Sequence, residues 1–186
     1  DLAGLDRFFS RYKVSHAFMT TQMARLFVLN YPHTPLTYLL TGGEKLPTLP
    51  PPRAYTLVNL YGPTETLCSV SSWKVGSKER DIPIGYPNPG TKFYILDAQG
   101  RPLPPGQWGE LYIASPQIML GYIDRPEVES KVLLANPFYD PHSDPPALAK
   151  MYASGDRVCQ SPDGYYLIGG RWDRQVKIRG FRLELG

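Results

Sequence analysis

The sequence contains no disulfide framework, leader peptide or long apolar run. Its two cysteines, Cys68 and Cys159, lie far apart and lack the spacing of a metal or redox motif. The first residues have neither the basic start nor the apolar core of a signal peptide. Every apolar stretch is interrupted well before the ~20 residues that a membrane-spanning helix needs. These absences argue against a membrane partner and make a reducing, cytoplasmic location the expectation.

The sequence also lacks a block of charge of one sign. Its formal net charge is +3 over 186 residues, and basic residues alternate with acidic ones almost everywhere. This pattern argues against a nucleic-acid partner. The apolar content of 42% and the charged content of 20% are ordinary for a globular protein, and the length is that of one domain with a buried core.

Signatures of hydrolases and of zinc sites are missing as well. No Ser-His-Asp or Gly-x-Ser-x-Gly arrangement occurs. The histidines His16, His33 and His142 have no cysteine or carboxylate partner at ligand spacing, so they are interpreted as core or surface residues.

The first zone of the chain, residues 1–70, has the pattern of an α/β unit. Apolar residues at helical spacing predict helices over 3–12 and 21–30. Two short apolar runs at 36–41 and 56–60 each end at a turn that contains glycine. Helices that alternate with such strands favour a sheet that is at least partly parallel.

The second zone, residues 71–170, has frequent Pro and Gly and short alternating runs. Strands are predicted at 92–97, 110–114 and 165–168, and this spacing favours an antiparallel barrel or sandwich. The last zone, 171–186, is a polar connector followed by one more strand. The chain starts within a predicted helix and stops directly after a predicted strand, so we expect a fragment of a larger protein.

The segment NLYGPTET, residues 59–66, is the sharpest local signal. A buried strand ends in the rigid turn Tyr-Gly-Pro and then presents Thr64 and Glu65 side by side. A hydroxyl beside a carboxylate suits a phosphate and a magnesium ion, because the hydroxyl donates to phosphoryl oxygen and the carboxylate binds the metal. The alternative is a capped turn with a solvated glutamate.

The segment TGGEKL, residues 41–46, ends the preceding strand. Paired glycines permit close approach of a ligand to the backbone, although they lack the spacing of a Walker loop. Two successive strands thus end in such loops, which is where open α/β sheets bind ligands. A simple turn is the alternative.

The later motifs YASGD and GGRWD contain a possible ribose-binding pair. Asp156, after what reads as a glycine turn, can accept hydrogen bonds from two hydroxyls, and Arg171 can donate to ribose or phosphate. A turn aspartate and a surface cation are the alternatives. In QVKIRG, the alternation places Lys177 and Arg179 on one face of a strand, which a solvated basic face would also explain.

Taken in order, the segments NLYGPTET, IPIG, FYILDAQG, PPGQWGELYIA, GYIDRP, YASGD and GGRWDRQVKIRGFRLELG resemble the adenylate-forming superfamily. The proline of YGPTE and the QVKIRG ending resemble the amino-acid adenylation domains of nonribosomal peptide synthetases. The resemblance implies the latter part of the large subdomain of such an enzyme. Its expected fold is a partial α/β sheet layer plus a small antiparallel β-barrel, ending at the hinge strand.

The resemblance also implies residue roles. Residues expected to bind ATP are Gly43, Glu44, Lys45, Asn59, Tyr61, Thr64, Asp156 and Arg171. Expected catalytic residues are Thr64, Glu65 and Lys177, and Glu65 would bind Mg²⁺. The amino-acid pocket would include Phe18, Leu40, Gly42, Leu60, Cys68 and Ser69. Asp173 would be the hinge, Lys177 and Arg179 would lie in a loop that reaches the site, and Ile168 replaces an aromatic residue common in relatives.

The implied reaction is ATP-dependent formation of an aminoacyl-AMP, which is then loaded onto the phosphopantetheine of a carrier protein. The uncharged pocket positions favour a neutral side chain in the substrate. The phosphate loop and the catalytic lysine of the family would lie outside this sequence, so the fragment alone is expected to be inactive. It would need the remaining parts of its own adenylation domain as a partner. The alternatives are an acyl- or aryl-CoA synthetase fragment and a non-catalytic module that binds nucleotide or a partner protein.

Overall fold

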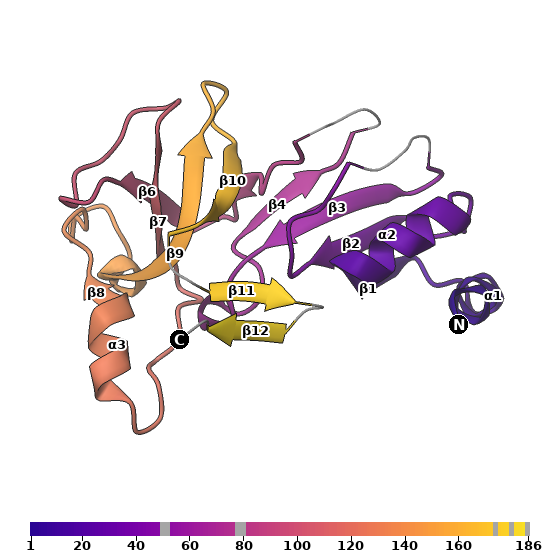
Figure 1. The fold of residues 1–186 in the computed structure, drawn as a ribbon, viewed down its shortest axis with the longest axis horizontal. Coiled ribbons are helices and arrows are strands. Elements are labelled where there is room, and N and C mark those ends of the chain that lie inside the picture. Colours follow the sequence, from indigo (N-terminus) through magenta and orange to yellow (C-terminus); the bar gives the residue numbers. More distant parts are fainter. Residues whose placement is uncertain (49–52, 77–80, 173–174, 179–180, 185–186) are drawn as a thin grey trace.

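The computed structural model describes residues 1–48, 53–76, 81–172, 175–178 and 181–184, with side chains up to residue 172. These residues form two five-stranded sheets and one two-stranded sheet. Figure 1 shows the first sheet on the right of the molecule and the second on the left, with their neighbouring ends in contact.

The first sheet is mixed. In spatial order it contains β1 (His16–Thr20), β2 (Tyr38–Gly42), β3 (Thr56–Tyr61), β4 (Ser71–Lys74) and β5 (Tyr86–Pro87). The first three strands are parallel, as the alternation of helices and apolar runs predicted, and β4 and β5 add to them in antiparallel fashion. Because β3 pairs with β4, strand pairing continues across residue 70, where a domain boundary was expected. The division into 1–70, 71–170 and 171–186 stays a prediction.

Two helices accompany this sheet. Helix α1 (Leu2–Tyr12) begins at Asp1, whose side chain accepts a hydrogen bond from the Ala3 amide, and it ends at Lys13 in the left-handed conformation. Helix α2 (Thr21–Asn30) starts directly after β1 and packs its buried face on the sheet (Figure 1). Both helices match their predicted ranges closely, because an apolar stripe at helical spacing is a local signal.

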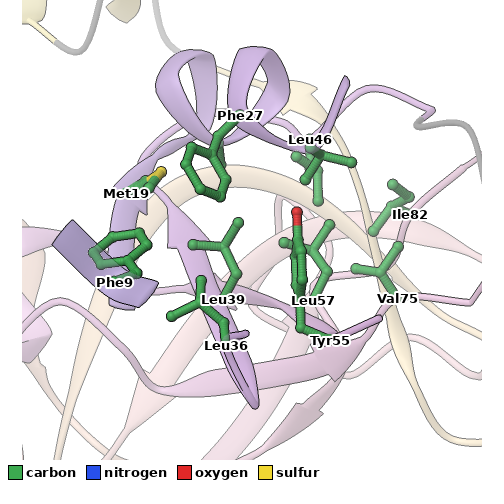
Figure 2. Packing of buried hydrophobic residues seen from close by; sticks show 12 residues of the cluster. Phe9, Met19, Phe27, Leu36, Leu39, Leu46, Tyr55, Leu57, Val75 and Ile82 are labelled. Carbon is green, nitrogen blue, oxygen red and sulfur yellow. The ribbon is translucent and has the colours of Figure 1, made fainter. Parts of the chain in front are cut away.

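The main apolar core lies between α2 and the sheet (Figure 2). Leu39 of β2 and Leu57 of β3 are paired in register, and both are completely buried beneath Phe27 of α2. Side chains alternate between the two faces of a strand, so the even-numbered residues of these strands face away from α2. Phe18 and Leu40, which pair between β1 and β2, belong to that second, more exposed face.

The second sheet is antiparallel and open. Its spatial order is β10 (Tyr166–Arg171), β9 (Lys150–Gln160), β7 (Trp108–Ala114) and β6 (Lys92–Leu96), with β8 (Leu133–Ala135) beside β9. The α/β fold class is confirmed, but the described strands do not close into the expected barrel. The outer edge of β10 instead meets the first sheet: Tyr166 donates its amide to Gly85, and its carbonyl accepts from Ile84.

The longest strand, β9, was not predicted. YASGD was interpreted as a glycine turn, whereas Asp156 lies inside an 11-residue strand. Gly155 has φ of +70° at an irregular point of the β7–β9 register, so it kinks the strand rather than reversing it. The short helix α3 (Pro126–Val132) was also not predicted.

The remaining elements are short. Two 3₁₀ turns, η1 (Thr64–Thr66) and η2 (Pro146–Leu148), lie between strands, and β11 (Gln175–Ile178) pairs antiparallel with β12 (Phe181–Glu184). The predicted hinge residue Asp173 and the basic residue Arg179 lie outside the described residues. None of the described helices is long and apolar enough to cross a membrane.

Candidate functional site

A cavity of about 650 Å³ lies where the two sheets meet. All of the predicted nucleotide-binding residues except Thr64 line it: Gly43, Glu44, Lys45, Asn59, Tyr61, Asp156 and Arg171. Four segments that are distant in the sequence thus converge on one space. The parallel pairing of β2 and β3 brings the segments that follow these two strands together, because their carboxyl ends lie at the same edge of the sheet.

The loop after β2 is fixed to the start of α2. Gly43 has φ of +105°, a conformation that favours glycine, and so turns the chain at the end of the strand. The Thr21 hydroxyl donates to the Glu44 carbonyl at 3.2 Å and accepts from the Glu44 amide at 3.3 Å. The side of the cavity formed by Gly43, Glu44 and Lys45 is therefore anchored to α2 through hydrogen bonds between Thr21 and the Glu44 backbone.

A buried carboxylate forms the polar centre of the cavity. Asp156 is only 6% exposed; it accepts a hydrogen bond from the Tyr61 hydroxyl at 2.5 Å and from Arg171 Nη1 at 2.8 Å. Asp156 and Arg171 are directly paired across β9 and β10, so the antiparallel register places them side by side. The alternatives of a turn aspartate and a surface cation are wrong, because Asp156 is buried inside β9 and Arg171 forms a partly buried ion pair with it.

Tyr61 is held in its protonated form. Burial of the phenol is the largest cause, and the negative charge of Asp156 adds to it; together they raise the pKa of Tyr61 well above its usual value of 10.0. The hydroxyl therefore donates to Asp156 at any physiological pH. This contact joins β3 of the first sheet to β9 of the second across the cavity.

Asn59 lines the cavity with a side chain whose amide group is already hydrogen-bonded. Its side chain is buried, and its Nδ2 donates to the Pro83 carbonyl at 2.8 Å. Ile168 also lines the cavity. Asn59 and Ile168 therefore contribute uncharged surface to this cavity.

Glu65 is buried, not solvated. It lies in η1 and is 5% exposed, and the Tyr122 hydroxyl donates to its Oε1 at 2.6 Å. Its backbone carbonyl accepts from the Met119 amide at 2.8 Å. Thr64 beside it is exposed. The alternative of a capped turn with a solvated glutamate is therefore wrong with respect to Glu65.

Glu65 lines a second cavity, of about 570 Å³, which shares Arg171 with the first one. Tyr122 also lines it and was not predicted as a functional residue. Its only sequence signal is its place in GYIDRP, one of the ordered motifs. Among the described residues, no cluster of three or more His, Cys, Asp or Glu could hold a metal ion.

The predicted amino-acid pocket residues lie partly on one face of the first sheet. Phe18 pairs with Leu40 and Gly42 pairs with Leu60, so all four belong to the face that points away from α2. Phe18 is 60% exposed. Gly42 is required by close packing, since a Cβ there would lie 2.6 Å from the backbone oxygen of Leu60.

The other two pocket residues, Cys68 and Ser69, follow η1. Cys68 is a free, exposed thiol with φ of +70°, and Leu67 before it is also in the left-handed region. These consecutive non-glycine residues mark a strained turn, a feature that often occurs beside ligands. Lys177 lies in β11, and its side chain is outside the described part of the structure.

Solved structures with the same fold define the class of this domain. The chain superposes on PA1221, an NRPS protein containing adenylation and PCP domains, with a TM-score of 0.85 and 28% identity; it covers 100% of this chain and 39% of that one. An artificially fused adenylation–PCP di-domain NRPS from Klebsiella oxytoca gives a TM-score of 0.84 at 24% identity, covering 99% and 35%. The fold is that of the latter part of an adenylation domain.

The sequence comparisons agree. A family profile described as AMP-binding enzyme matches residues 3–123, and the chain belongs to that family. It is 37% identical over 186 residues to bacitracin synthase 1 of Bacillus licheniformis, and 43% identical over 185 residues to malpinin synthetase of Mortierella alpina. These matches include 100% and 95% of this chain but only 3% and 2% of the relatives' own lengths.

Proposed function

We propose that this chain is the part of an amino-acid adenylation domain that holds the nucleotide. In the intact protein the substrate carboxylate attacks the α-phosphorus of ATP. The bond to the leaving pyrophosphate breaks, and an aminoacyl-AMP forms. The aminoacyl group then passes to the phosphopantetheine thiol of a peptidyl carrier protein. By itself the chain is expected to be inactive, since the family's phosphate loop and catalytic lysine lie outside it.

The convergence of the predicted nucleotide residues on one cavity carries this proposal. Asp156 is the ribose ligand: its carboxylate is already oriented by Tyr61 and Arg171, so little reorganisation is needed for it to accept from the ribose hydroxyls. The Gly43–Lys45 loop and the wall formed by Asn59 bind the base. Thr64, exposed at the start of η1, donates to the α-phosphate.

Glu65 fits a magnesium ion. Mg²⁺ is usually bound by one or two carboxylates together with substrate phosphates, so a single buried carboxylate beside a hydroxyl is a suitable donor set. When bound, the ion neutralises negative charge on the phosphates. Tyr122 contributes by fixing one carboxylate oxygen, which orients the other.

The pocket supports a neutral substrate side chain. Phe18, Leu40, Gly42 and Leu60 share one face of the sheet, and Cys68 and Ser69 add no charge. A charged side chain would lose its hydration there without a partner in this part of the pocket. Asp173 is proposed as the hinge toward the carrier-loading state, with Lys177 and Arg179 in the loop that then reaches the site.

The test is ATP–pyrophosphate exchange by the intact adenylation domain, with each proteinogenic amino acid in turn. We expect exchange with neutral amino acids. Exchange only with Asp, Glu, Lys or Arg would refute the substrate class, and no exchange with any amino acid, together with acyl transfer to free CoA, would support the CoA-synthetase alternative. Binding of AMP without any turnover would support a non-catalytic module.

A further inference from the structure

A cation in contact with two tryptophan rings follows Asp156 directly in β9, on the opposite face of that strand. The guanidinium carbon of Arg157 is 4.9 Å from the ring centroid of Trp108 and 5.7 Å from that of Trp172. Both distances are within the ~6 Å at which an aromatic ring attracts a cation. The three residues, here called the Trp–Arg–Trp cluster, come from β7, from β9 and from the position after β10, so they link three successive parts of one sheet.

The cluster does not fill the core. Trp108 is 37% exposed and Trp172 is 58% exposed. Trp108 lies over Gly169, where an added Cβ would approach the ring to 2.6 Å. Within the described part of the chain Arg157 forms no ion pair, so its charge is directed at the two rings. Two large side chains kept at the surface around one cation suggest a role in holding a segment in place.

The segment that needs holding is the one that carries Arg171. It is preceded by two glycines, Gly169 and Gly170, the second with φ of +118°, and by a β-bulge. Glycines restrict the backbone little, so the direction of Arg171 is weakly fixed from that side. On the other side, the Trp172 amide donates to the Gly155 carbonyl at 2.9 Å, and the Trp172 ring contacts the guanidinium of Arg157.

We propose that Arg157 and Trp172 are positioning residues for Arg171. The Trp–Arg–Trp cluster keeps the backbone after the glycine pair against β9, so that the Arg171 guanidinium stays directed at Asp156. The inference rests on the proposed function, in which Asp156 and Arg171 bind the ribose of the nucleotide. Loss of the cluster then weakens only the contacts with the ribose hydroxyls. Binding of the base is unaffected, because the loop after β2 is held separately by Thr21.

The experiment measures AMP binding by titration calorimetry with the intact adenylation domain that contains this chain. Trp172→Ala and Arg157→Gln are each expected to weaken AMP binding by about fivefold. Trp172→Phe keeps a ring and Arg157→Lys keeps the charge, so both should bind more tightly than the variants that remove those groups. Because the two residues act together, the double variant should be little weaker than either single one.

Two controls separate positioning from a general structural effect. The first is 2′,3′-dideoxy-AMP, which lacks the ribose hydroxyls: the unchanged domain and Trp172→Ala should bind it equally well. The second is Trp73→Ala, which removes a ring from a different aromatic group, with Tyr86 and Tyr165, and should leave AMP binding unchanged.

The outcomes are distinguishable. Equal AMP affinity of Trp172→Ala and the unchanged domain would overturn the inference, and so would an equal loss for AMP and its dideoxy analogue. If Trp172→Ala unfolds, Arg157→Gln and Arg157→Lys are compared instead. Equal AMP affinity of these two variants would overturn the inference, and so would an equal loss by Arg157→Gln for AMP and for its dideoxy analogue. Failure of the unchanged domain to bind AMP would instead refute the proposed function itself.

Discussion

The two sheets differ in what they bury and in what they contribute to the shared cavity. In the first sheet, β2 and β3 bury leucines such as Leu39 and Leu57 against α2, and the loop after β2 contributes Glu44 and Lys45 to the cavity lining. In the second sheet, β9 has partners on both sides and buries polar residues, including Ser154 and Asp156. The charged groups Asp156 and Arg171 of the cavity's ion pair both come from this second sheet.

The difference shows where a carboxylate can be buried at low cost. Asp156 lies on a central strand, so the neighbouring strand brings Arg171 into register, and the Ser154 hydroxyl contacts its amide at 3.1 Å. The first sheet has no such arrangement at its edge, where β1 has β2 as its one partner among the described strands. The ion pair of the cavity therefore comes from the second sheet, whereas the first sheet contributes the loop that contains Glu44 and Lys45.

Among the changes that test this difference between the sheets, Asp156→Asn should have the largest effect on the free energy of unfolding. The change keeps the shape but removes the negative charge that pairs with Arg171, and breaking a pair in which the carboxylate is buried costs about 3 kcal/mol. The free energy of unfolding, measured by urea titration, should fall by that amount. Asp97→Asn is the matched control, because its ion pair with the largely exposed Arg101 lies in a turn of the same sheet. A similar loss for both variants would contradict the distinction between buried and exposed charge.

Glu65→Gln tests whether the first sheet carries any charge that acts in the reaction. The amide can still accept from Tyr122, so the melting temperature should stay nearly unchanged. Loss of the negative charge should lower ATP–pyrophosphate exchange in the intact domain by about 100-fold, as when one electrostatic group is removed from an active site. An unchanged rate would remove Glu65 from the site, and a large loss of stability would make it a structural residue.

Hydrogen exchange compares the stability of the two sheets directly. Amides in the middle of the second sheet, such as those of Tyr112 and Ile113, should exchange slowly because their strand has partners on both sides. Amides in 14–19 should open with a free energy about 2 kcal/mol lower, since among the described strands β1 is an edge strand and its Phe18 is exposed. Equal protection in both sheets would contradict the comparison.

Tyr122→Phe tests the contact by which the second half of the chain holds Glu65. Removing the hydroxyl leaves the ring in place but removes its hydrogen bond to Glu65 Oε1. A hydrogen bond to a charged group is worth about 1.5 kcal/mol, so the Mg²⁺ concentration for half-maximal exchange should rise about tenfold. Tyr112→Phe, whose hydroxyl contacts Glu110 at 3.3 Å, is the control and should not move this concentration.

Tyr55→Phe should have the smallest effect, and only at high pH. Burial raises the pKa of Tyr55 to about 12, although the charge of Arg53 lowers it in part. An unfolded tyrosine titrates near 10, so the stabilising contribution is complete below pH 10 and is lost as the pH rises toward 12. The variant should equal the unchanged chain at pH 7, because the described residues offer the hydroxyl no hydrogen-bond partner. In urea titrations at pH 11 the variant should be the more stable of the two, and equal stability at both pH values would refute this.

Local patterns in the sequence were sufficient for much of the first sheet. Helix α2 has the predicted bounds, and β2 and β3 differ from the predicted runs by one or two residues, since apolar periodicity is carried by neighbouring residues. The ordered motifs also predicted the family, which the profile match confirms. The same local reasoning failed at YASGD, where a glycine inside a long strand has the pattern of a turn.

The site itself depended on tertiary structure. The hydrogen bond between Tyr61 and Asp156 joins residues 95 positions apart, and the one between Tyr122 and Glu65 joins residues 57 apart. A glutamate after a turn is solvated or buried according to whether a distant tyrosine reaches it, and no local pattern encodes that distance. The sequence by itself determined the two helices of the first sheet, strands such as β2, β3, β6 and β7, and the residue types of the site. Only the packing of the two sheets decided which of these residues are buried, paired and charged together, because burial and pairing are properties of contacts between segments that are remote along the chain.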